Sequence, residues 1–185
     1  MIEGAVKMIY QAHYNSPLGG ILLSSDEEGL TGLWFDGEKY YPTEEKMEKM
    51  REEENPILSE TKRWLDIYFS GVNPSFLPPL HPVGSTFRKY VWDILLEIPY
   101  GETVTYGSIA KKLEKKLGYK KMSSQAVGGA VGHNEISIVI PCHRVVGTNG
   151  SLTGYAGGID KKVKLLGLEH VDMSKFFVPK TGTAL

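Results

Sequence analysis

The sequence predicts an α/β lobe followed by a mostly α-helical domain, and two observations lead to this prediction. Short apolar and aromatic runs separated by turn residues occupy most of the first 35 positions, as is typical of antiparallel strands. After a segment with four prolines, 72–84, the apolar residues follow a helical rhythm instead. The expected boundaries are an α/β lobe at 1–75, a linker at 76–84, a second domain at 85–172 and a C-terminal tail at 173–185.

The first lobe is expected to hold three strands and one long helix. The strands lie at 7–13, 20–25 and 29–35, and Asn-Ser-Pro, Asp-Glu-Glu and Asp-Gly turns follow them in that order. After a polar, acidic segment, 56–70 places apolar residues at helical spacing and is followed by a glycine. This pattern predicts a small antiparallel sheet with a helix packed on it.

Three helices are expected in the second domain, and each is preceded by residues that can cap it. These helices are 86–96, 106–117 and 125–131, with Ser85 or Thr86, Thr105, and Ser123 or Ser124 as their respective caps. The second and third are joined by a lysine-rich connector. Two short helices with such a connector resemble a helix-turn-helix, in which the second helix usually enters a DNA groove.

The composition limits the class of protein. The chain has 185 residues, 41% of them hydrophobic, a formal net charge of −1 and a single cysteine. One cysteine excludes an intramolecular disulfide and a zinc site built from several thiolates. Because a lone thiol survives best in a reducing compartment, we expect a cytoplasmic protein, or a nuclear one in a eukaryote. The first residues lack a signal-peptide pattern and no apolar run approaches the ~20 residues of a membrane span, so no membrane partner is expected.

Charge is unevenly distributed along the chain. Carboxylates dominate 44–60, whereas 111–121 carries six lysines against one glutamate. The lysine cluster, which includes Lys120 and Lys121, can contact the phosphates of a nucleic acid. The alternative is an ordinary solvated helix face.

The third expected helix of the second domain is built mainly from glycine and alanine, at 126–132. Glycine inside a helix costs roughly 1 kcal/mol relative to alanine, so this composition needs a reason. One reason is close packing against a neighbouring helix. The other is a slim helix that approaches a nucleic-acid groove, from which larger side chains would hold it away.

The only cysteine, Cys142, follows an apolar stretch and a proline and precedes His143. A thiol becomes a strong nucleophile as the thiolate, and a neighbouring base is one way to form it. Taken alone, a Cys-His pair is more often a packing cysteine beside a histidine. The surrounding motifs favour the reactive interpretation.

Together these motifs resemble the O6-alkylguanine-DNA alkyltransferases, also called methylated-DNA–protein-cysteine methyltransferases. In chain order the matching residues are Thr86-Phe87, Val91-Trp92, Ile98-Pro99, Gly101-Glu102-Thr103-Val104-Thr105-Tyr106, Ala126-Val127-Gly128-Gly129-Ala130, Asn134, Pro141-Cys142-His143-Arg144-Val145, Gly150-Ser151-Leu152-Thr153-Gly154-Tyr155-Ala156-Gly157-Gly158, and Leu165-Leu166 before Glu169. The resemblance implies a ribonuclease-H-like topology for the first lobe. It also implies a DNA repair protein that moves the alkyl group of O6-alkylguanine to its own cysteine once, with O4-alkylthymine as an open second substrate.

The resemblance also implies the roles of individual residues. The catalytic set is Cys142 as acceptor, His143 acting through a water, Glu169 orienting His143, Asn134 bracing the turn before the cysteine, and Tyr106 donating toward guanine N3. No cofactor and no metal are implied. The adjacent Cys142 and His143 are not expected to touch directly, because neighbouring side chains often diverge.

The implied partner is double-stranded DNA carrying O6-alkylguanine, bound through the minor groove with the damaged base turned out of the helix. The implied DNA- or substrate-binding residues are Gln125, Ala126, Gly128, Gly129, Arg144, Val145, Thr148, Tyr155, Ala156, Lys120 and Lys121. Gln125 departs from the family, which usually has an arginine there to fill the gap left by the extruded base. The connector at 114–121 is longer than usual. A monomer is the expected state.

Three other functions remain to be weighed. Alkyltransferase-like proteins share the scaffold and flag lesions, but they lack the acceptor cysteine that this chain has at Cys142. A cysteine hydrolase with a Cys-His-Glu set would leave the slim helix and the basic connector unexplained. A helix-turn-helix regulator would leave the cysteine motif without a use.

Overall fold

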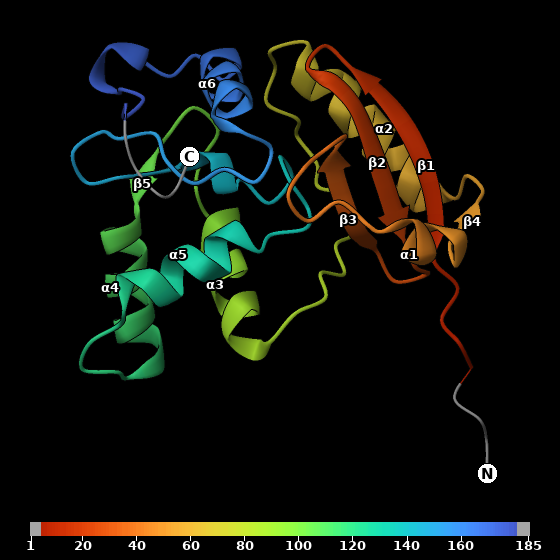
Figure 1. Ribbon diagram of the computed structural model, residues 1–185, viewed down its shortest axis with the longest axis horizontal. Helices are drawn as coiled ribbons and strands as arrows, with labels where there is room; N and C mark the ends of the chain where they lie inside the picture. Colours follow the sequence, from red (N-terminus) through yellow and green to blue (C-terminus); the bar gives the residue numbers. More distant parts are fainter. Residues whose placement is uncertain (1–4, 181–185) are drawn as a thin grey trace.

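The computed structural model describes residues 5–180, in which a sheet-containing lobe lies beside a helical domain (Figure 1). The elements are β1 (Tyr10–Ser16), β2 (Gly19–Ser25), β3 (Leu30–Phe35), α1 (Glu44–Glu48), β4 (Arg51–Glu52), α2 (Pro56–Phe69), α3 (Thr86–Leu96), β5 (Val104–Thr105), α4 (Tyr106–Leu117), α5 (Ser124–Gly132), β6 (Val145–Val146) and α6 (Ile159–Leu168), with short 3-10 turns at Cys142–Arg144 and Met173–Lys175. None of the helices in this part of the chain is both long and apolar enough to cross a lipid bilayer.

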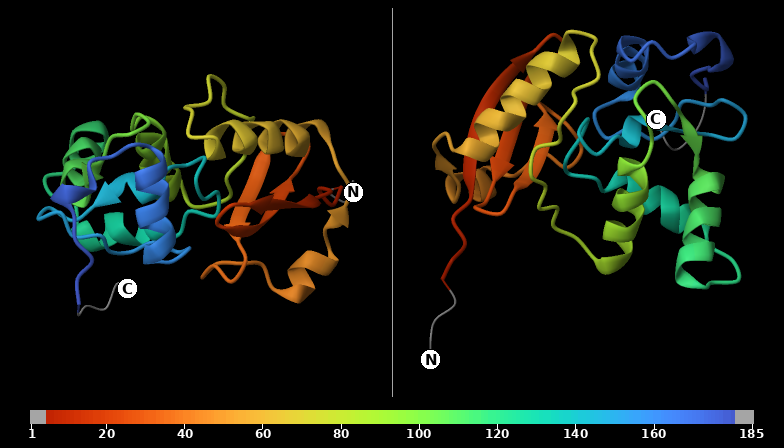
Figure 2. Two further views of the ribbon diagram at one scale, coloured as in Figure 1. Left: turned by 90° about the horizontal axis from the view of Figure 1, so that it is seen from above. Right: turned by 180° about the vertical axis from the view of Figure 1, so that it is seen from behind.

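The sheet of the first lobe has the strand order β3-β2-β1-β4. Strands β1 to β3 are antiparallel, as predicted, whereas the short β4 pairs parallel with β1. Helix α2 lies across one face of the sheet (Figure 2). Its buried face includes Leu58, Leu65 and Tyr68, and its first turn is capped by Asn55. The predicted lobe of sheet plus helix is confirmed.

The start of the chain differs from the prediction. The sequence predicts a strand at 7–13 followed by a turn that includes Ser16, but β1 begins at Tyr10 and runs through Ser16. The Ser16 hydroxyl donates to the carbonyl of Gly19 and accepts from the amide of Leu18, which closes a turn of only two residues. The acidic segment after β3 also contains α1 and β4, for which the sequence gives no clear signal.

The outer edge of β3 holds two other parts of the chain. The proline-rich linker pairs with its first residue, since Leu30 donates to Pro79 and accepts from His81. Further along, Leu33 donates to the carbonyl of Glu135 and accepts from the amide of Ser137. The first lobe therefore fixes the segment that leads to Cys142.

The helical domain confirms the three predicted helices. Ser85, Thr105 and Ser123 each accept a backbone N–H in the first turn of α3, α4 and α5, respectively. Helix α4 ends at Gly118, whose φ of +72° is in the left-handed region that favours glycine. Helices α4 and α5 pack against each other and against α3, as expected for a helix-turn-helix.

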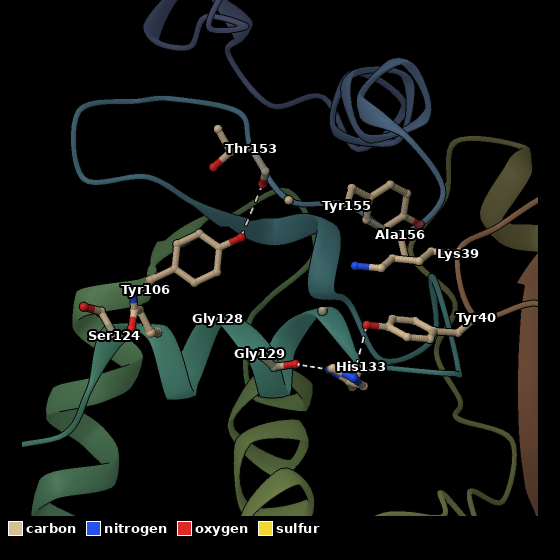
Figure 3. Close-up of a pocket in the computed structure, with 13 residues that line it drawn as sticks. Lys39, Tyr40, Tyr106, Ser124, Gly128, Gly129, His133, Thr153, Tyr155 and Ala156 are labelled. Atoms are coloured by element: carbon tan, nitrogen blue, oxygen red, sulfur yellow. Dashed lines mark hydrogen bonds between the residues drawn. The ribbon is translucent and has the colours of Figure 1, made fainter. Parts of the chain in front are cut away.

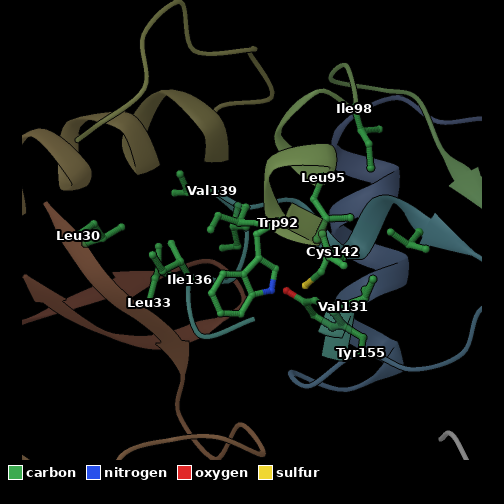
Figure 4. Close-up of a cluster of buried hydrophobic side chains, with 14 of the residues drawn as sticks. Leu30, Leu33, Trp92, Leu95, Ile98, Val131, Ile136, Val139, Cys142 and Tyr155 are labelled. Carbon is green, nitrogen blue, oxygen red and sulfur yellow. The ribbon is translucent and has the colours of Figure 1, made fainter. Parts of the chain in front are cut away.

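One hydrophobic core joins the two parts (Figure 4). Leu33 of the sheet and Val139 of the loop before Cys142 belong to the same cluster as Trp92 and Leu95 of α3. The Trp92 indole also donates to the carbonyl of Ala130 in α5, at 2.9 Å. The helices that carry the site therefore share their packing with the sheet.

Candidate active site

Cys142 opens the 3-10 turn Cys142–Arg144 and is 5% exposed. The preceding loop contains Ile138 with a φ of +69°, which is costly for a β-branched residue. The loop is held in this shape by β3 on one side and by its own hydrogen bonds, including one from the Cys142 amide to the carbonyl of Ile140. The sulfur thus lies on a strained turn whose shape is fixed by several hydrogen bonds of the surrounding structure.

Asn134 braces this turn, as the sequence analysis expects. Its amide nitrogen donates to the carbonyls of Ile136 and Ile140, and its oxygen accepts from the amide of Ile136. All three bonds are buried. Loss of the side chain would leave the Ile136 amide without this acceptor, whereas the carbonyls of Ile136 and Ile140 would keep the bonds that they accept from the amides of Ile140 and Cys142.

His143 and Glu169 are brought together from positions 26 residues apart, with 2.8 Å between Nε2 and Oε1. An ionised carboxylate only accepts, so Nε2 carries the ring hydrogen and Nδ1 of the neutral ring has its lone pair free. Nδ1 is buried and has no hydrogen-bond partner among residues 5–180. Burial lowers the pKa of His143, which keeps the ring neutral and able to take a proton.

Glu169 accepts from an unusually large number of donors. Besides His143, the Tyr68 hydroxyl of α2 donates to it at 2.9 Å and the Gly101 amide at 3.2 Å. The Arg144 guanidinium adds bonds to both carboxylate oxygens. Burial alone would raise the pKa of Glu169, but the hydrogen bond from His143 and the bonds and positive charge of Arg144 lower it to about 2.

Arg144 corrects one sequence-based expectation. It was expected to contact DNA or substrate, but it is 7% exposed and points into the protein. Its guanidinium is used by Glu169 and by the carbonyl of Ile98, at 2.6 Å. An isolated buried charge is costly, so the arginine and the carboxylate neutralise each other. Its role is to hold Glu169 beside His143.

The thiol itself is not ionised in this environment. Burial raises the pKa of Cys142 to about 11, and the charge of Glu38 acts in the same direction. The Asn134 amide and the positive charge of Lys162 oppose this rise. Formation of the thiolate therefore needs a base close to the sulfur.

Lys162 is a buried residue beside the site that the sequence reasoning missed. It lies on α6 with no exposed surface, and its ammonium donates to the carbonyls of Val145 at 2.6 Å and Thr153 at 2.9 Å. Burial lowers its pKa to about 8. Lys162 precedes Glu169 by two helical turns, so the spacing offered a signal that both share one face.

A cavity of about 580 Å³ opens between α5, Tyr106 and the loop of Tyr155 (Figure 3). Its lining residues are Lys39, Tyr40, Tyr106, Ser124, Gln125, Gly128, Gly129, Gly132, His133, Thr153, Gly154, Tyr155 and Ala156. The Tyr106 hydroxyl donates to the carbonyl of Thr153 at 3.3 Å, and burial raises its pKa to about 12. Gly154 has a φ of +69°, and a Cβ there would lie 3.2 Å from the Tyr106 oxygen. A flat ring can enter here between Tyr106 and the loop of Tyr155.

Helix α5 presents its glycines to open space. A Cβ built on Gly128, Gly129 or Gly132 would meet no atom within 4 Å outside the helix itself. The explanation by close packing against a neighbouring helix is therefore wrong. The remaining explanation is a slim helix that another molecule can approach closely.

The other expected binding residues occupy three places. Gln125 and Ala126 are exposed at the start of α5, and Lys120 and Lys121 are exposed on the connector before it. Thr148 is exposed but lies in the 147–150 turn, outside the lining of the cavity.

Val145, in contrast, is buried. It is one of the implied binding residues, and its carbonyl, which already accepts from Lys162, has one lone pair left for a base. Within residues 5–180, no three His, Cys, Asp or Glu side chains gather as a metal site would require.

Two family models match the chain. One, described as the ribonuclease-like domain of 6-O-methylguanine DNA methyltransferase, matches residues 9–82. The other, described as the DNA binding domain of 6-O-methylguanine DNA methyltransferase, matches residues 86–171.

Relatives of similar length exist among characterised proteins and solved structures. The methylated-DNA–protein-cysteine methyltransferase of Methanosarcina acetivorans is 47% identical over 162 residues, which cover 87% of this chain and 98% of the relative. The crystal structure of the Mycobacterium tuberculosis O6-methylguanine methyltransferase aligns with a TM-score of 0.75 at 36% identity, over 94% of this chain and 97% of that one. A structure of OGT from the same organism in complex with DNA aligns with a TM-score of 0.75 at 37% identity, over 90% and 94% of the two chains.

Proposed function

The chain belongs to the methylated-DNA–protein-cysteine methyltransferases, which move the methyl group of O6-methylguanine in DNA to a cysteine, and we propose that Cys142 is the acceptor. One observation carries this assignment. The residue after the only cysteine is a buried neutral histidine whose Nε2–H is held by an ionised carboxylate and whose Nδ1 is unpaired within residues 5–180. This is the arrangement of a nucleophile, a base and a group that orients the base.

The reaction then follows from the geometry. The Cys142 proton passes to Nδ1 of His143 through a bridging water, and Glu169 stabilises the imidazolium that forms. The sulfur attacks the methyl carbon, so that an S–C bond forms as the bond from that carbon to O6 breaks. The electron pair stays on guanine, which takes up the proton held by His143. Tyr106, a weak acid with a pKa of about 12, supports the departing base with a hydrogen bond rather than a proton.

The product is a thioether, and the chain has no second thiol that could remove the methyl group. Each molecule therefore reacts once.

The test is mass spectrometry of the protein after incubation with a duplex that contains one O6-methylguanine. We expect a gain of one CH2 unit, localised to Cys142, with a yield that never exceeds one per chain. Cys142→Ala should bind the same duplex and gain nothing. An unmodified wild-type protein would instead favour a lesion-binding protein, and repeated release of product would favour a hydrolase.

DNA binding is expected to use α5, and we place this helix in the minor groove. The open space over Gly128 and Gly129 supports close approach to a groove, and the exposed Lys120 and Lys121 are positioned to reach phosphates beside it. The damaged base must leave the stack to reach a sulfur that is 5% exposed. Fluorescence of a 2-aminopurine placed opposite the lesion would report this extrusion.

We further propose a monomer in a reducing compartment, the cytoplasm or, in a eukaryote, the nucleus. The acceptor must stay a free thiol until it meets a lesion, which supports the compartment. Sedimentation velocity with and without DNA tests the first point, and fractionation of cells tests the second.

A further inference from the structure

We propose that Lys39, supported by Tyr40, forms a phosphate-binding subsite at the mouth of the base cavity, which holds the DNA backbone next to the extruded nucleotide. The proposal rests on the proposed function, because it takes the cavity as the place where the base enters. It gives the first lobe a direct part in DNA binding.

The position of these residues is the first argument. Both belong to the loop between β3 and α1, in the first lobe, yet both line the cavity together with Gly129 of α5 and Ala156 of the loop beyond the cysteine turn. The Lys39 side chain extends from that loop into the space between Tyr155 and His133 (Figure 3). Gln125 lies in the first turn of α5, toward the opposite end.

The loop is fixed in this place by contacts across the cavity. The Lys39 amide donates to the carbonyl of Ala156 at 3.2 Å. The Tyr40 ring packs against His133 at a tilt of 31° with 4.6 Å between centroids, and its hydroxyl lies 3.1 Å from Nε2. Because Nδ1 of His133 donates to the carbonyl of Gly129, Nε2 of the neutral ring accepts from Tyr40. The first lobe is thereby attached to α5 and to the loop that faces it.

The charge on Lys39 is unused inside the protein. The side chain is exposed, and no carboxylate within residues 5–180 forms an ion pair with it. Its neighbour Glu38 turns inward, where it accepts from the Phe35 amide and the Ser137 hydroxyl. The Tyr40 ring lies 5.4 Å from the Lys39 ammonium and helps to orient it.

The chemistry of an extruded nucleotide identifies the ligand. The base is flat and enters the cavity, but its two flanking phosphates are charged and remain at the mouth in water. A free ammonium at that mouth is complementary to a phosphodiester and has no counterpart on the base itself. Lys39 and α5 would then hold the strand from two sides.

The first experiment measures binding without chemistry. In a Cys142→Ala background, the dissociation constant for a duplex with one O6-methylguanine is measured against salt concentration, with and without Lys39→Gln. One lost phosphate contact should flatten the slope of log K against log salt by about 0.7–0.9. Lys49→Gln, an exposed lysine of the same lobe outside the cavity, is the control and should flatten it less.

The second experiment separates a phosphate contact from a change in cavity shape. With Cys142 restored, Lys39→Gln should slow methyl transfer from the duplex several-fold at low salt, and Lys39→Arg should restore it. Transfer from the free base O6-methylguanine, which has no phosphate, should be unchanged. An unaltered salt slope, or an equal loss with the free base, would overturn the subsite. If wild-type protein transferred no methyl group at all, the proposed function would fail, while the binding experiment would still decide about Lys39.

Discussion

Substitution of Lys162 by methionine tests whether a buried cation supports the cysteine site. Methionine has a similar length and no charge, so the change removes the ammonium that donates to Val145 and Thr153. The Thr153 carbonyl keeps its bond from Tyr106, whereas the Val145 carbonyl loses its donor. A buried carbonyl left unpaired costs about 1–3 kcal/mol.

The opposing contribution is the burial of the charge itself. The pKa of Lys162 falls from 10.5 to about 8, and each unit corresponds to ~1.4 kcal/mol, so the charged form is penalised by about 3 kcal/mol near neutral pH. The two effects nearly cancel. We expect the free energy of unfolding at pH 7 to change by no more than about 2 kcal/mol.

The difference in stability between wild type and Lys162→Met should depend on pH, and the direction of this change follows from the pKa of Lys162. The unfolded state binds more protons than the folded state between pH 8 and 10.5, because the folded pKa is the lower one. Wild-type stability therefore gains from this group as the pH rises, and the methionine variant has no such gain. From pH 7 to 9 the difference between wild type and variant should move by about 1 kcal/mol in favour of wild type. Cys142 is present in both proteins, so its own titration largely cancels.

In Lys162→Met the rate of methyl transfer should change far more than the free energy of unfolding. The charge of Lys162 lowers the pKa of the Cys142 thiol, and a rise of one unit corresponds to a tenfold smaller thiolate fraction. We expect the single-turnover rate to fall in Lys162→Met, by about tenfold for each unit by which the pKa of the thiol rises. Lys164→Met, an exposed lysine on the same helix, is the matched control and should keep both rate and stability. A wild-type rate in Lys162→Met, or a stability difference that is constant between pH 7 and 9, would refute the reasoning.

Three further predictions concern the base, the helix and the connector. If His143 takes the proton of Cys142, the single-turnover rate should not rise from pH 7 to 9 and should fall as Lys162 loses its charge near pH 8. In His143→Ala the rate should instead rise with pH, because the thiol then loses its proton to solvent, and equal profiles would contradict the role of His143. Gln125→Arg should tighten binding to lesion-bearing duplex and speed repair, measured as the second-order rate. An unchanged or lower rate would count against a role of this side chain in filling the gap left by the extruded base. Neutralising Lys120 and Lys121 together should flatten the salt slope of DNA binding by up to about 1.8, and an unaltered slope would mean that the connector faces away from DNA.

Local signals in the sequence predicted much of the fold. The caps at Ser85, Thr105 and Ser123 are read from single residues next to an apolar stripe, and all three are present. Helix α6 carries no such signal, because it follows Gly158 with a φ of +95° and no side chain caps it. The start of α6 depends on how the residues after Gly158 pack, and a local sequence pattern does not carry that information.

The direction in which a side chain faces was harder to predict than its presence. Arg144 lies in a short 3-10 turn, where neither helical nor strand periodicity says which side is buried, and its assignment to DNA or substrate came from the resemblance. The pairing of His143 with Glu169 came from family resemblance, since nothing in a separation of 26 residues implies a contact. Tyr68 was beyond reach for the same reason, because it arrives from the other lobe.

The structure gives the first lobe three separate parts in the site. Its strand β3 holds the loop on which Ile138 adopts a left-handed conformation, so the lobe fixes the direction of the cysteine turn. Its helix α2 supplies Tyr68, a donor to the carboxylate that orients His143. Its loop after β3 carries Lys39 to the mouth of the cavity. A lobe that only stabilised the helical domain would need the shared core alone. The backbone edge of β3 and the buried Tyr68 hydroxyl position the nucleophile and its base. If Lys39, which has no ion pair within residues 5–180, binds a phosphate as we propose, the same lobe also positions the bound strand.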